Sequence, residues 1–63
     1  MNATYTSPEG HEYTIHETTF HNPGTNLETL LFVMVNESGS VVKVTTSSME
    51  VVRWVREFDL VLL

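Results

Sequence analysis

The sequence reads Ser7-Pro8-Glu9-Gly10 at one point and Asn36-Glu37-Ser38-Gly39 at another, and these two stretches decide the fold. Each begins with a residue favoured at the first position of a type I turn, and each has glycine at the fourth position. A glycine there can adopt positive φ and form the bulge of a three-residue hairpin loop. The flanking segments are rich in β-forming residues. The sequence therefore predicts two antiparallel hairpins.

The loop type fixes the register of each hairpin, which can be checked against the side chains. In the first hairpin the predicted pairs run from Ser7–His11 to Ala3–Ile15, and they sort into a polar face and an aromatic-aliphatic face. The predicted pairs of the second hairpin, from the turn outward, are Asn36–Ser40, Val35–Val41, Met34–Val42, Val33–Lys43, Phe32–Val44 and Leu31–Thr45. This second hairpin is apolar on both faces.

Two further signals complete the expected elements. Asn22-Pro23-Gly24 predicts a type II turn that connects the hairpins. Ser47 and Glu50 have the spacing of a capping box, and an apolar stripe follows them, so residues 48–58 are expected to be helical. The valines and the alternating apolar residues leave a strand as the alternative for this segment. Residues 59–63 are expected to form a short apolar tail or a last strand.

The expected architecture is α+β: a four-stranded antiparallel meander, made of two hairpins, with one C-terminal helix packed on one face. Residues 1–63 are expected to form a single small domain, because a chain of this length builds one core at most. The residues that the helix is expected to cover are Tyr5, Tyr13, Ile15, Phe32, Met34, Val42 and Val44. A second apolar face then needs another cover, since such patches usually mark interfaces.

We expect this second face to support self-association. Domains of this size have a marginal core and usually need disulfides, a metal or a partner subunit. The chain has no cysteine, so a homodimer is the expected support. The predicted self-association face consists of Leu31, Val33, Val35, Val41, Leu60 and Leu62.

Charge is distributed unevenly along the chain. The net charge is −5, and residues 1–42 contain five glutamates but no Lys or Arg. Direct binding of nucleic acid is disfavoured, because phosphates are bound mainly by Lys and Arg. A basic protein surface is the better electrostatic match. The expected binding residues, on an acidic hairpin edge, are Glu9, Glu12, His16, Glu17 and Glu37.

No motif indicates catalysis or cofactor binding. His11, His16 and His21 are spaced five residues apart, which places neighbours in this series on opposite faces of a strand rather than around one metal ion. The sequence contains no Gly-x-Ser-x-Gly motif, no Walker loop and no His-Glu-x-x-His motif. We therefore expect no metal, no cofactor and no enzymatic activity.

No apolar run is long enough to span a membrane and no signal-peptide pattern is present, so a cytoplasmic protein is expected.

Three functional hypotheses follow. The first is a small acidic, non-enzymatic protein-interaction module that engages a basic, nucleic-acid-binding host protein. Its sharpest version is an inhibitor from a phage or mobile element, of the anti-defence or anti-CRISPR type. The second is a structural or regulatory subunit that acts mainly through homo-oligomerisation. The third and least favoured is a small metal- or ligand-binding enzyme.

Overall fold

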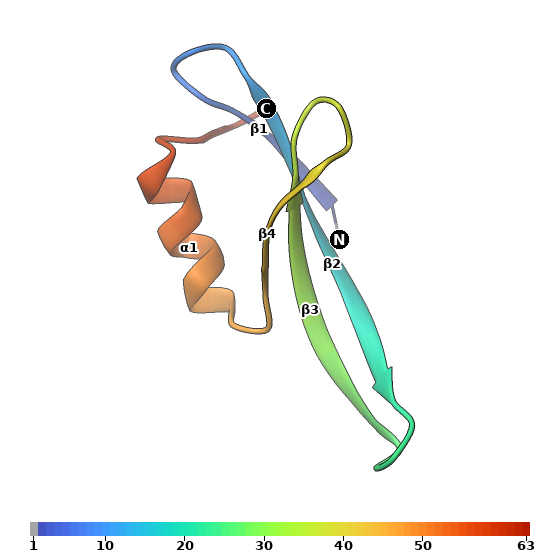
Figure 1. Cartoon of the computed structure of the whole chain (residues 1–63). Coiled ribbons are helices and arrows are strands. Elements are labelled where there is room, and N and C mark those ends of the chain that lie inside the picture. The colour runs from blue at the N-terminus through green and yellow to red at the C-terminus, as the bar shows by residue number, and fades with distance from the viewer. Residues whose placement is uncertain (1) are drawn as a thin grey trace.

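The computed structural model describes residues 2–63 and arranges them as an antiparallel sheet with one helix on one side (Figure 1). The elements in chain order are β1 (Asn2–Thr6), β2 (Glu12–Asn22), β3 (Leu27–Val35), β4 (Val41–Thr45), α1 (Ser48–Glu57) and β5 (Val61–Leu62). The strand order across the sheet is β4-β3-β2-β1-β5. The α+β class is confirmed, and the described sheet has five strands rather than four because the C-terminal tail pairs with β1.

The first hairpin has the predicted register. The pairs run from Thr6↔Glu12 to Asn2↔His16 and include Ala3↔Ile15. Next to the turn, the Ser7 backbone N–H donates to the His11 carbonyl oxygen over 2.9 Å. Gly10 has φ = 88°, so the glycine adopts the positive φ that the turn requires. Turn chemistry alone was sufficient to fix this hairpin.

The second hairpin departs from the predicted register after its first two pairs. Val35 faces Val41 as expected, but Met34 then faces Lys43 instead of Val42, and every later pair is shifted by one. A β-bulge between these pairs causes the shift. Because β4 lies at the edge of the sheet, the extra residue disturbs the ladder on one side only, which is where bulges are most often tolerated.

The turn between β2 and β3 also differs from the prediction. Positive φ occurs at Asn26 (56°) and not at Gly24, so the type II turn expected at Pro23-Gly24 is not formed. The backbone N–H groups of Thr25 and Asn26 both donate to the Asn22 carbonyl oxygen. Strand β2 therefore continues to Asn22 and β3 begins at Leu27, so the two strands form a long hairpin of their own.

Helix α1 confirms the helical interpretation of this segment, but its predicted capping box is absent. Ser47 makes no side-chain hydrogen bond to the helix, and the Glu50 carboxylate accepts a 2.8 Å hydrogen bond from Arg53 instead. The helix ends in a Schellman motif: the Leu60 N–H donates to the Val55 carbonyl, and the Asp59 N–H donates to the Arg56 carbonyl. This motif reverses the chain and directs it toward β1.

The core lies between α1 and the facing side of the sheet. Four apolar side chains are buried, one from each of β2, β3, α1 and the segment after α1: Ile15, Met34, Trp54 and Leu60. Tyr5, Tyr13 and Phe32 pack against them as predicted. Val42 and Val44 do not, with 38% and 53% of their surfaces exposed, because the bulge changes the register of β4.

The far half of the β2–β3 hairpin extends beyond the helix (Figure 1). We call residues 18–31 the arm. In this segment β2 pairs with β3 alone, because β1 reaches only to His16 and β4 only to Phe32. Every residue from 19 to 30 is exposed. The arm gives the molecule a longest dimension of 43 Å, compared with 23 and 17 Å in the other two directions.

Candidate interaction site

The β1–β2 turn, the β3–β4 turn and the C-terminus of α1 lie at one end of the molecule, and the tip of the arm lies at the other (Figure 1). The topology requires this arrangement. Strand β4 leads away from its turn, and α1 then runs back, so the helix must end near the turns. Four carboxylate residues gather there, and we call them the acidic end: Glu9, Glu37, Glu57 and Asp59.

A depression of about 340 Å³ separates the β1–β2 turn from the end of α1. Tyr13 and Phe58 contribute an aromatic surface to it, with their ring centroids 5.8 Å apart. The carboxylates that line it come from Glu9, Glu57 and Asp59, and its described lining contains no Lys or Arg. Aromatic faces and carboxylates are both groups that attract an ammonium or guanidinium ion. The chemistry of this depression therefore suits a basic side chain.

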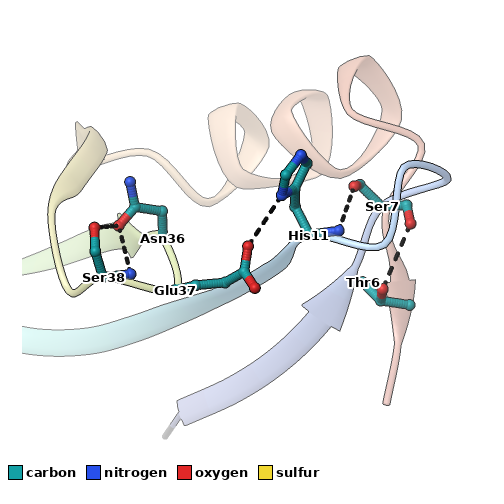
Figure 2. A network of polar contacts seen from close by, with 6 residues as sticks. All are labelled: Thr6, Ser7, His11, Asn36, Glu37 and Ser38. Carbon is teal, nitrogen blue, oxygen red and sulfur yellow. Dashed lines mark hydrogen bonds and ion pairs between the residues drawn. The ribbon is translucent and has the colours of Figure 1, made fainter.

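The two turns are connected by a polar contact next to this depression. His11 Nδ1 lies 3.0 Å from a carboxylate oxygen of Glu37, and both side chains are more than half exposed (Figure 2). The Asn36 side-chain oxygen accepts hydrogen bonds from the Ser38 and Ser40 backbone N–H groups, which orders the second turn. An exposed pair such as His11–Glu37 contributes little to stability, so its main effect is to orient the two side chains.

The structure divides the predicted acidic hairpin edge. Glu9 and Glu37 lie at the acidic end. Glu12 and His16 lie on β2 and point to the face away from α1, because their pairing partners Thr6 and Val33 do so. Glu17 is one residue further along β2 and therefore lies on the opposite face from His16. The five predicted residues do not form one surface.

Sequence reasoning missed four residues of the depression: Tyr13, Glu57, Phe58 and Asp59. Tyr13 was predicted among the residues that the helix covers, but not as part of a binding surface. The direction of the chain carried the missing signal, since a helix that follows an edge strand must return toward that strand's own turn. Applying this rule would have placed the C-terminus of α1 near the β3–β4 turn, at the end of the molecule that also holds Glu9.

Two of the six residues predicted for self-association lie elsewhere. Leu60 is 7% exposed and belongs to the core, because the Schellman motif turns it inward. Leu62 pairs with Tyr5 and therefore lies on the same side of the sheet as α1. The other four residues, Leu31, Val33, Val35 and Val41, share the face away from the helix. We call this face the back face.

The bulge makes the back face more continuous than predicted. It moves Lys43 to the helix side, opposite Met34, and brings Val44 to the back face, opposite Val33. Phe20 and Leu27 extend the same surface along the arm, where they are 56% and 65% exposed. We call the resulting surface the apolar stripe; it consists of Phe20, Leu27, Leu31, Val33, Val35, Val41 and Val44.

No group of three or more His, Cys, Asp or Glu side chains within residues 2–63 could hold a metal ion. His16 and His21 lie on opposite faces of β2, as their spacing predicted. No helix of the described chain is long and apolar enough to cross a membrane. Comparison with family models, curated proteins and solved structures gives no match for this chain.

Proposed function

We propose that this chain is a non-enzymatic protein-interaction module whose acidic end binds a basic surface of another protein. The depression between Glu9, Glu57 and Asp59 carries the proposal, because an aromatic surface surrounded by carboxylates suits an Arg or Lys side chain. Glu37 adds a further carboxylate nearby. The net charge of −5 would speed the encounter with a basic partner and make it sensitive to salt.

The class of partner follows from the same chemistry. Proteins that bind nucleic acid present Lys and Arg side chains to neutralise phosphates. Carboxylates gathered at one end of a small protein can occupy such a surface in place of phosphates. The specific form of the proposal is therefore a cytoplasmic inhibitor of a nucleic-acid-binding host protein, as encoded by phages and mobile elements, including the anti-CRISPR type.

A matched pair of variants tests the acidic end. Glu9→Gln/Glu57→Gln removes two carboxylates from the depression. Glu17→Gln/Glu28→Gln removes two carboxylates from β2 and β3, outside the depression. Both variants therefore have the same net charge. Each serves as bait in a lysate of the natural host, and captured proteins are released by raising the ionic strength from about 0.05 to 0.5 M.

We expect the unmodified chain and the Glu17/Glu28 variant to retain the same basic protein until the salt is raised. The Glu9/Glu57 variant is expected to lose it. Equal capture by the two variants would show that net charge alone attracts the partner and would refute a site at the acidic end. Failure of the unmodified chain to capture any basic protein would refute the proposal as a whole.

A second function, a subunit that acts mainly through homo-oligomerisation, is favoured by a different observation. The apolar stripe runs along β3 from the arm to the rest of the sheet, which together with α1 we call the body. Such a surface is unusual on a small monomer that functions alone. The two functions respond in opposite directions to salt, because apolar association persists or strengthens as ionic strength rises.

A further inference from the structure

We infer that two copies of this chain pack back face to back face and antiparallel, so that the arm of each copy covers the body of the other. This pairing specifies which surface binds a second copy and in which orientation. It does not depend on binding of a basic partner by the acidic end. Four observations support it: the large exposed surface of the chain, the marginal stability of the arm, the low charge of the back face, and the position of the acidic end.

The isolated chain exposes more surface than a compact protein of its mass. A folded monomer of 7.2 kDa is expected to expose about 4,100 Å², whereas this chain exposes 4468 Å². Its radius of gyration is 12.8 Å, compared with about 10.6 Å for a compact domain of this length. The arm accounts for the elongation. Residues 2–63 bury only four apolar side chains, so covering this excess surface would add substantially to the stability of the fold.

The arm itself needs a cover. A two-stranded ribbon is marginally stable in water unless further strands or a helix support it. Within the arm, no third strand pairs with the described residues, and none of them belongs to the core cluster or to the half-buried apolar residues that pack against it. Phe20 and Leu27 nevertheless place large apolar side chains on its back face. Packing on a second apolar surface would bury these two side chains and stabilise the ribbon.

The back face can pack against the back face of a second copy without bringing many like charges together. The chain has eight Asp and Glu residues and three Lys and Arg residues. Among the strand residues of the described chain, only Glu12 places a carboxylate on the back face, and it lies beside the β1–β2 turn, at the end of the stripe that contains Val35. Thr, Asn and His16 account for the remaining polar positions on β1 and β2. Two acidic chains can therefore associate through this face with little repulsion.

The acidic end decides the orientation. It lies opposite the tip of the arm (Figure 1). A parallel arrangement would place two acidic ends side by side, and it would stack one unsupported arm on another. An antiparallel arrangement separates the acidic ends and lays each arm over the body of its partner. Leu31, halfway between Leu27 and Val35 along β3, would then lie near the two-fold axis.

Sedimentation equilibrium, across concentrations from about 1 µM to 1 mM, measures the association. Val44→Lys tests the stripe on the body and Phe20→Glu tests it on the arm. Val52→Lys is the matched control, because Val52 on α1 is 50% exposed and Val44 is 53% exposed. If Val44→Lys does not fold, as judged by circular dichroism, Val41→Lys replaces it, since Val41 is 61% exposed on the same face.

We expect the unmodified chain and Val52→Lys to dimerise equally, and each stripe variant to raise the dissociation constant at least tenfold. Mixing Phe20→Glu with Val44→Lys should restore dimerisation, because the antiparallel arrangement brings the arm of one copy to the body of the other. A monomer at all concentrations, or a dimer unaffected by Val44→Lys, would overturn the inference; the second result would indicate pairing of strand edges. Failure of the mixture to associate would overturn the antiparallel orientation.

Salt distinguishes this inference from the proposed function. The dimer is measured with the purified chain alone, and its dissociation constant is expected to stay constant or fall as sodium chloride is raised. Binding of a basic partner is expected to weaken under the same change. A dimer that dissociates on adding salt would refute an uncharged interface, whatever the outcome of the partner experiment.

Discussion

The two halves of the long β2–β3 hairpin have similar strands but different surroundings. In the body, Ile15 and Met34 face α1 and are 6% and 0% exposed. In the arm, Leu30 lies on the same face of β3 as Met34, four residues away, and is 41% exposed. Local sequence does not produce this difference, because both segments have strong β propensity. The helix produces it, because α1 covers the body and does not extend over the arm (Figure 1).

The largest expected effect is a contrast between these two residues of β3. Met34→Ala should lower the free energy of unfolding by about 2–5 kcal/mol, because it leaves a cavity in the core. Leu30→Ala should cost less than about 1 kcal/mol, because the side chain is already partly solvated. Urea denaturation followed by circular dichroism measures both. Similar losses for the two variants would mean that the arm is packed as tightly as the body.

Hydrogen exchange should show the same contrast along the backbone. At concentrations where the chain is monomeric, we expect amides of the arm to exchange at least about tenfold faster than amides of β2 and β3 in the body, because the arm can open without unfolding the core. The His21↔Glu28 pair and the Ile15↔Met34 pair are the sites to compare. Equal protection in the two regions would contradict independent opening of the arm. Protection of the arm that rises with concentration would support the dimer.

The sequence predicted the first hairpin better than it predicted the bulge in β4 and the acidic end. The register of β1 and β2 followed from one turn, because a hairpin loop determines its own flanking pairs. The bulge in β4 could not be predicted, since Val41, Val42 and Val44 fit either face and no glycine marks the extra residue. Half of the acidic end was predicted through Glu9 and Glu37. Glu57 and Asp59 were missed because their position depends on how α1 docks.

Replacing one glycine in the body and one in the arm compares how the backbone conformation of each region contributes to stability. Gly39 ends the β3–β4 turn with φ = 85°, and the space that a Cβ would occupy there is open, so Gly39→Ala should cost about 1–2 kcal/mol from conformational strain alone. Gly24 at the tip of the arm lacks positive φ, and Gly24→Ala should change stability by less than about 0.5 kcal/mol. Thermal denaturation compares the two. A large loss from Gly24→Ala would show that the tip is coupled to the core.

The smallest expected effect concerns two positive-φ residues that are not glycine. Asp59, with φ = 50°, occupies the position of the Schellman motif that usually holds glycine, and Asn26, with φ = 56°, lies at the tip of the arm. Asp59→Gly should stabilise the chain by about 0.5–1 kcal/mol, because it relieves a left-handed conformation in a segment that unfolds together with the core. Asn26→Gly should have almost no effect, since asparagine tolerates this conformation and the arm contributes little to global stability. Thermal denaturation of both variants measures the difference.

Asp59→Asn separates conformation from charge at the acidic end. It removes the carboxylate but keeps a side chain at the same φ, so a gain seen with glycine and not with asparagine comes from the backbone. An equal gain from both variants that disappears at high ionic strength would instead identify repulsion from Glu9 and Glu57, which line the same depression, as the cause. That result would mean that the chain tolerates a destabilising cluster of carboxylates at this end. Such a cluster is expected where selection maintains binding of a cation at the expense of stability.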